Sequence, residues 1–174
     1  MKFHLFYFAI LIASCSNTSQ FNKTNSSGET PISEAININT IHTDSGVVST
    51  KLISNKMLNF SNNKFPYFEF PEKIQIVLYD KNMSETKIFS DYAISYSDTD
   101  LIDLRGNVVV STPLRDTLFS DQLYYNSEIE WLFTDYNFRY VSENKDIYGK
   151  GFNSDKEFKN VTFSDVSGYL SIEE

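Results

Sequence analysis

Cys15 is the only cysteine of the chain, so its thiol is the only sulfur nucleophile available for covalent modification. Lys2 gives the chain a charged start, residues 3–12 are apolar, and Ala13 and Ser14 are small. This order is typical of a secretory signal peptide. An apolar run of about ten residues is also shorter than the roughly twenty that span a bilayer. The pattern therefore predicts a secretory signal peptide that ends just before Cys15.

The segment Leu11-Ile12-Ala13-Ser14-Cys15 resembles the lipobox of bacterial lipoproteins, in which the cysteine is diacylated and becomes the new N-terminus. We predict a lipoprotein signal peptide over residues 1–14. Residues 15–34 are polar and without periodicity, which predicts a lipidated N-terminus followed by a flexible tether. Two alternatives stay open: an ordinary signal peptide with a stray cysteine, and an uncleaved membrane anchor.

Elsewhere the residues that could support catalysis are few. His4 falls in the predicted signal peptide and His42 lies near the tether. Asp98, Asp100 and Asp103 lie close together, but no His or Cys joins them, so a solvated turn is favoured over a metal site. There is no Gly-rich phosphate loop, and the carboxylates are too scattered to predict a glycosidase pair. We expect no enzyme activity, no metal and no cofactor.

The composition is acidic and aromatic. Without Lys2 the chain has 14 basic and 23 acidic residues, a net charge near −9, which does not suit nucleic acid as a partner. With one cysteine there is no intrachain disulfide, so an apolar core must stabilise the fold. Fifteen Phe, eleven Tyr and one Trp supply much of that core and favour strands.

A short pattern recurs along the chain. The copies are Ile53-Ser54-Asn55-Lys56-Met57, Phe89-Ser90-Asp91-Tyr92-Ala93, Phe119-Ser120-Asp121-Gln122-Leu123 and Tyr148-Gly149-Lys150-Gly151-Phe152. The last three are each followed by a polar turn and a second strand candidate, over residues 101–110, 129–141 and 158–166. Upstream, residues 36–41 and 47–53 flank the turn signal Asp44-Ser45-Gly46. Repeats of this kind stack on their neighbours, and no helical period is present. We predict an all-β fold of stacked antiparallel strands, open at both ends.

Alternation within these strands predicts which side chains point inward. Val108 and Val110 share a parity, and Ala93 and Leu123 occupy equivalent places in the repeat. The full inward set is Met57, Ala93, Leu104, Val108, Val110, Leu123, Leu132, Tyr136, Phe138, Tyr140 and Phe152. The outward set is Asn107, Asp135, Asn137 and Arg139. A slip of one residue would invert every assignment.

Three segments resemble the LptC family, the lipopolysaccharide export components of the periplasm. Residues 103–110 (Asp-Leu-Arg-Gly-Asn-Val-Val-Val) resemble its Gly-Asn-Val strand. Residues 118–123 resemble its next strand, Leu-x-Thr-x-x-Leu, with Ser120 in place of Thr, and residues 147–152 resemble its Ile-x-Gly-x-Gly-Phe segment. Ser45-Gly46 fits its opening turn. The resemblance covers residues 36–170, within a predicted LptC-like domain over 35–172. The best-known members carry an N-terminal transmembrane helix, so this chain would be a lipid-anchored variant.

The resemblance implies an open twisted β-jellyroll, V-shaped in section, with an apolar groove that takes acyl chains while the sugars stay in water. Acyl chains cost about 0.8 kcal/mol per CH₂ to expose, so a carrier needs a continuous apolar lining. The expected lining is Met57, Ala93, Leu104, Val108, Val110, Leu123, Leu132, Phe138, Tyr140 and Phe152. Alternation alone favours a closed core over a groove; the resemblance reverses that preference.

The resemblance also implies partners and a location. Such proteins take lipopolysaccharide from an inner-membrane ABC transporter and pass it to the next β-jellyroll of a periplasmic bridge. An open stack leaves strand edges that invite strand addition. The N-terminal edge, about residues 36–42, would face the transporter, and the C-terminal edge, about residues 158–172, the bridge protein. The alternative is a capped edge, with Glu173-Glu174 as gatekeepers. We expect a periplasmic protein anchored in the inner rather than the outer membrane.

Two other functions remain open from the sequence. The first is a structural or adhesion lipoprotein with a closed β-repeat core. The more remote one is a carbohydrate-active enzyme, which would need a cleft with paired carboxylates.

Overall fold

The computed structural model describes residues 30–170 of the chain. The described residues form eleven strands in one antiparallel sheet, and the prediction of an all-β fold of stacked antiparallel strands is confirmed. The strands are β1 (Ser33–Asp44), β2 (Val47–Asn59), β3 (Tyr67–Phe70), β4 (Ile74–Tyr79), β5 (Glu85–Ser90), β6 (Tyr92–Tyr96), β7 (Leu101–Ser111), β8 (Thr117–Asn126), β9 (Trp131–Ser142), β10 (Lys145–Asp155) and β11 (Thr162–Leu170).

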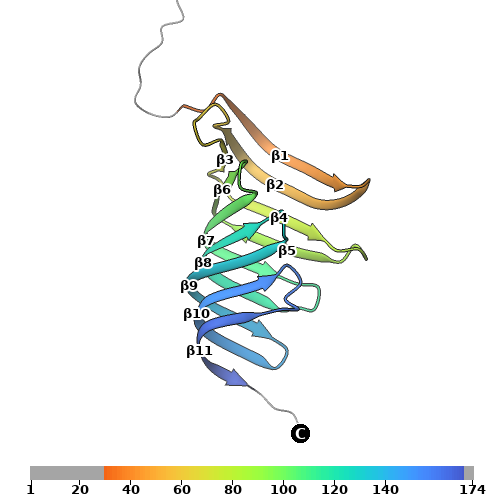
Figure 1. Cartoon of the computed structure of the whole chain (residues 1–174), viewed down its shortest axis with the longest axis vertical. Coiled ribbons are helices and arrows are strands. Elements are labelled where there is room, and N and C mark those ends of the chain that lie inside the picture. The colour runs from red at the N-terminus through yellow and green to blue at the C-terminus, as the bar shows by residue number, and fades with distance from the viewer. Residues whose placement is uncertain (1–29, 171–174) are drawn as a thin grey trace, which may run out of the picture.

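The strands stack along the long axis of the molecule from β1 to β11, and the C-terminal end lies at the far end of the stack (Figure 1). β1 pairs only with β2, and β11 pairs only with β10. The sheet does not close into a barrel, because neither of these outer strands finds a second neighbour among the described residues.

A line of irregularities crosses the sheet halfway along its strands. The pairing register shifts on this line between β7 and β8, between β8 and β9, and between β9 and β10. β5 ends and β6 begins on either side of Asp91, and Gly106, Asn107 and Gly151 adopt positive φ angles of 75°, 48° and 76°. Bulges of this kind bend a strand sharply. We call this line the crease.

Serines mark the crease in three copies of the sequence repeat. The hydroxyl oxygens of Ser54, Ser90 and Ser120 lie 3.0, 2.9 and 2.9 Å from the carbonyl oxygen two residues farther on. Such local side-chain bonds compete with the regular ladder and favour a break. In the fourth copy the same place is taken by Gly149, whose Cβ, if present, would lie 2.1 Å from the carbonyl oxygen of Asp165. The repeat in the sequence is therefore a repeat of the crease.

The crease divides the sheet into two walls. β2 pairs with β4 on one side of it and with β3 on the other, and β7 likewise pairs with β5 and then with β6. The first wall comprises residues 74–79, 85–90, 108–111, 117–120, 138–142 and 145–149. The second wall comprises residues 67–70, 92–96, 101–105, 122–126, 131–134 and 152–155. Buried side chains from both walls form one cluster, so the two walls face each other.

Two details of the sequence interpretation are wrong. Tyr136, predicted to point inward, is 56% exposed, because β9 carries an extra residue between Thr134 and Asn137 relative to β10 and the chain turns outward there. Phe158, predicted to begin the last strand, lies in the loop before β11, which starts only at Thr162. The predictions for residues 1–14, for Cys15 and for Glu173-Glu174 lie outside the described residues.

Candidate functional site

The ten residues expected to line a groove lie in one place, between the two walls. Nine of them are buried members of a single apolar cluster, and Met57 is partly buried and packs against it. The nine are Ala93, Leu104, Val108, Val110, Leu123, Leu132, Phe138, Tyr140 and Phe152. They come from β6, β7, β8, β9 and β10, so the apolar lining continues from strand to strand along the stack.

The lining side chains pack on one another. Leu104 and Leu123 are paired across β7 and β8, and both are 0% exposed. Outward-predicted Asn137 and Arg139, by contrast, are exposed. Because the interior is filled by these side chains, an acyl chain could reach it only if the walls separate.

Aromatic rings concentrate toward the C-terminal end of this interior. Phe138 stacks on Phe163 with ring centroids 5.1 Å apart, and Phe152 contacts Phe158 at 5.2 Å. Tyr140 completes the group, 5.9 Å from Phe158. Burial, followed by the nearby carboxylate of Asp116, raises the pKa of Tyr140 to about 12. These rings bury large apolar areas and pack in stacked and edge-to-face arrangements at this end of the interior.

A buried polar chain crosses the second wall on three strands. Arg105 Nε donates to Asp103 at 2.9 Å, and Gln122 Nε2 donates to the other oxygen of Asp103 at 2.9 Å. Thr134 in turn donates to Gln122 Oε1 at 3.0 Å and accepts from the N–H of Tyr136. Asp103 is only 2% exposed, so the prediction that it belongs to a solvated turn is wrong. Each carboxylate oxygen has a donor, which is what a buried carboxylate requires.

Sequence reasoning missed two residues at the far ends of the walls, Lys156 and Phe158. Both are buried, although they lie in the loop between β10 and β11. The turn-like string Asp155-Lys156-Glu157 predicted only a solvated connection, and nothing in the sequence indicated that its lysine points back across the fold.

The described residues offer no centre for metal chemistry: residues 30–170 contain no group of three or more His, Cys, Asp or Glu side chains placed to hold a metal ion. The same part of the chain has no helix long and apolar enough to cross a membrane.

The described residues thus form an open, twisted antiparallel sheet with a continuous apolar interior. In agreement with it, a family profile described as lipopolysaccharide-assembly, LptC-related, matches residues 5–170, and the chain belongs to this family. No curated protein matches the chain. Membership gives the protein a role in lipopolysaccharide assembly and transport, as a non-enzymatic component of the periplasmic cell envelope that binds lipopolysaccharide and other export components.

Proposed function

We propose that this protein accepts lipopolysaccharide from the inner-membrane ABC transporter and passes it along the apolar interior to the next β-jellyroll of a periplasmic bridge. The observation that carries the proposal is the continuous lining contributed by five successive strands. A chain of a dozen methylenes exposed to water would cost on the order of 10 kcal/mol, and this lining is apolar along its whole length.

The two edges of the sheet support a place inside a bridge. β1 and β11 are the outer strands of the stack and point their free backbone groups in opposite directions along it. In our proposal residues 36–42 of β1 pair with the transporter. At the C-terminal edge, β11 pairs with the bridge protein by strand addition. Both contacts form by backbone pairing, and the acidic protein needs no electrostatic attraction to a nucleic acid or an anionic surface to make them.

We also propose that Cys15 is the anchor. After cleavage behind residue 14, a diacylated Cys15 would tie the fold to the periplasmic face of the inner membrane through the polar segment before β1. Mass spectrometry of the mature N-terminus tests this step, since Cys15→Ser would abolish both lipidation and signal processing. An intact N-terminus starting at Met1 would contradict it and favour an uncleaved anchor.

In-cell photo-crosslinking tests the carrier function itself. A photoreactive probe at Leu123, or at the partly buried Met57, should yield an adduct with lipopolysaccharide only when the transporter hydrolyses ATP. A probe at exposed Asn137 serves as the control and should give none. Absence of adducts at both interior sites in a folded, correctly located protein would overturn the proposal.

One observation favours a second candidate, a structural lipoprotein with a closed core. The lining residues are packed in this structure as tightly as an ordinary core, with Leu104 and Leu132 at 0% exposure. The same crosslinking experiment separates the two functions, because a closed core gives no energy-dependent adduct at any interior probe.

A further inference from the structure

Each wall ends in a rim at the side farthest from the crease, and we call the line along which the two rims meet the mouth. On the first wall this rim includes the end of β4 at Tyr79 and the turn that leads into β5. On the second wall it includes the turn before β9, with Glu130, and the loop after β10. Residues 155–160 of that loop, which we call the strap, reach from the second wall to the first.

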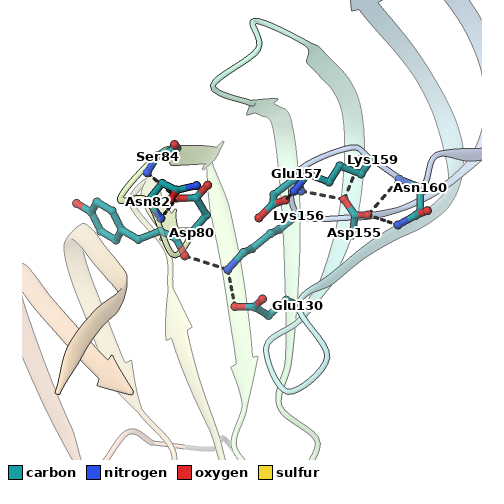
Figure 2. Close-up of polar contacts among 10 residues, drawn as sticks. Asp80, Asn82, Ser84, Glu130, Asp155, Lys156, Glu157, Lys159 and Asn160 are labelled. Carbon is teal, nitrogen blue, oxygen red and sulfur yellow. Dashed lines mark hydrogen bonds and ion pairs between the residues drawn. The ribbon is translucent and has the colours of Figure 1, made fainter. Parts of the chain in front are cut away.

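The strap is wound around one carboxylate. Asp155 Oδ1 accepts the N–H groups of Glu157 and Lys159 at 3.0 and 2.9 Å, and Oδ2 accepts the N–H and side-chain amide of Asn160 at 3.0 and 2.7 Å (Figure 2). These four bonds hold the shape of the loop from within, and the N–H of Lys156 also donates to the carbonyl oxygen of Glu130 at 3.1 Å. The strap is therefore shaped by its own carboxylate and attached by its backbone to the second wall.

Lys156 fastens the strap to both rims. Its Nζ lies 2.6 Å from Glu130 Oε1 on the second wall and donates to the carbonyl oxygen of Tyr79 on the first wall at 3.0 Å (Figure 2). Tyr79 is 77 residues away in the sequence, and Lys156 is only 8% exposed. The Lys156 side chain is 10% exposed and that of Glu130 is 49% exposed, so the ion pair is shielded from water on its lysine side only. Together with the bond to Tyr79, it joins the two walls at the mouth.

The same strap inserts a ring between the walls. Phe158 is 7% exposed and contacts Tyr140 of the first wall at 5.9 Å and Phe152 of the second wall at 5.2 Å. Its backbone has a φ of 58°, which is a strained angle for a bulky residue. Strain of this kind persists only where the surroundings enforce it, and it lowers the cost of releasing the segment.

The opposite rim faces the strap with its own carboxylate-wound turn. Asp80 Oδ1 accepts the N–H groups of Asn82 and Ser84, each at 2.8 Å (Figure 2). The Ser84 N–H is the largest cause of the lowered pKa of Asp80, and the charge of Lys159 on the strap adds a smaller effect. Lys159 of the strap therefore lies within electrostatic reach of this turn.

We propose that the strap is the gate of the apolar interior: Lys156 latches the two walls at the mouth, Phe158 plugs the space between them, and acyl chains pass when both are displaced. This inference rests on the proposed carrier function. It explains how a lining that is packed when the latch is closed can still receive a lipid from the side.

Lys156→Met tests the gate, because it keeps most of the side-chain volume and removes the charge. Lys81→Met is the matched control, since Lys81 is an exposed lysine on the turn across the mouth. In the full-length chain reconstituted in phospholipid nanodiscs, we expect amide hydrogen exchange of the strap and the end of β4 to rise about tenfold in Lys156→Met and to stay unchanged in Lys81→Met. Equal exchange in wild type and Lys156→Met would overturn the latch.

Lipid uptake then distinguishes the gate from the carrier function. With the probe at Met57, and with purified rough lipopolysaccharide, the inner-membrane transporter and ATP added to the nanodiscs, adducts should form about tenfold faster in Lys156→Met and in Phe158→Ala than in wild type. Adducts at the wild-type rate in both variants would refute the gate and leave the carrier function standing, whereas no adducts in any protein would refute the carrier function. Should Lys156→Met fail to fold, the same two measurements on Glu130→Gln test the gate. This variant weakens the ion pair with Lys156 and leaves the bond to Tyr79 in place.

Discussion

Asp103 is a buried carboxylate, and its burial is favourable only while hydrogen-bond donors satisfy both of its oxygens. Its carboxylate is buried and is satisfied by Arg105 and Gln122. Removing it leaves the Gln122 amide without its acceptor, and an unsatisfied buried polar group costs about 1–3 kcal/mol. We therefore predict that Asp103→Ala lowers the free energy of unfolding by about 2–3 kcal/mol in urea titrations. Asp98→Ala, in the exposed turn nearby, should stay within about 0.5 kcal/mol of wild type; equal effects would contradict the network.

Asp155 gives the strap a pH dependence. Burial alone would raise the pKa of Asp155, but the N–H of Lys159, the amide of Asn160 and further N–H groups lower it below the usual 3.8. A lowered pKa in the folded state stabilises the strap above about pH 4, and this contribution disappears as the pH falls through the folded-state pKa.

We predict that the amide NMR signals of Lys159 and Asn160 shift together on acidification, with a midpoint below 3.8. Asp155→Asn should remove this titration and make the strap exchange its amide hydrogens faster at neutral pH, since an amide oxygen is the weaker acceptor. A midpoint above the usual carboxyl value would show that the strap is not wound around Asp155.

At the scale of strands and turns, the crease depends on small residues. Gly149 lies where a Cβ would meet the carbonyl oxygen of Asp165 at 2.1 Å and the ring of Phe138 at 2.8 Å, so β11 or β9 must move to admit one. We predict that Gly149→Ala costs about 2–4 kcal/mol of stability, as overpacking against backbone does. Gly46→Ala is the control: its φ is 84° but nothing lies within 4 Å, so only the backbone cost of about 1 kcal/mol applies. Equal thermal shifts in both variants would mean that the crease tolerates side chains.

The sequence predicts the strands better than it predicts the crease. Alternation places Val108, Leu123 and Phe138 correctly inside, although each lies at or within a shift of the pairing register. It fails at Tyr136, where β9 carries an extra residue. The repeat also gives no sign that its copy over residues 89–93 spans the end of β5 and the start of β6. The serine that marks the crease in three of the four copies was visible as part of the repeat. Its meaning was not, because a serine bonded to a carbonyl two residues on looks like any strand serine.

For the whole molecule, the sequence could indicate an apolar interior but not how it is closed. The lining follows from parity and from the family resemblance. The latch joins Lys156 to Tyr79 over 77 residues, and no local pattern encodes such a contact. Long-range polar contacts between loops depend on the twist that brings the rims together, so they emerge only once the sheet is assembled. The gate is therefore a property of the tertiary fold, while the lining is a property of each strand.

The outermost strand should be separable from the rest of the molecule. β1 pairs only with β2, most of its side chains are exposed, with Ile36 at 68%, and none belongs to the buried core, so the core does not depend on it. We predict that Ile36→Pro, which removes a backbone donor from this edge, shifts the melting temperature by no more than about 2–4 °C. Under the proposed function the same variant should co-purify with the transporter at least tenfold less, because strand addition at β1 needs a regular edge.

Ile76→Pro in β4, which is paired on both sides, is the control and should instead unfold the protein. Retained co-purification in Ile36→Pro would move the docking site away from β1, and a melting temperature lowered as far as in Ile76→Pro would make β1 part of the core.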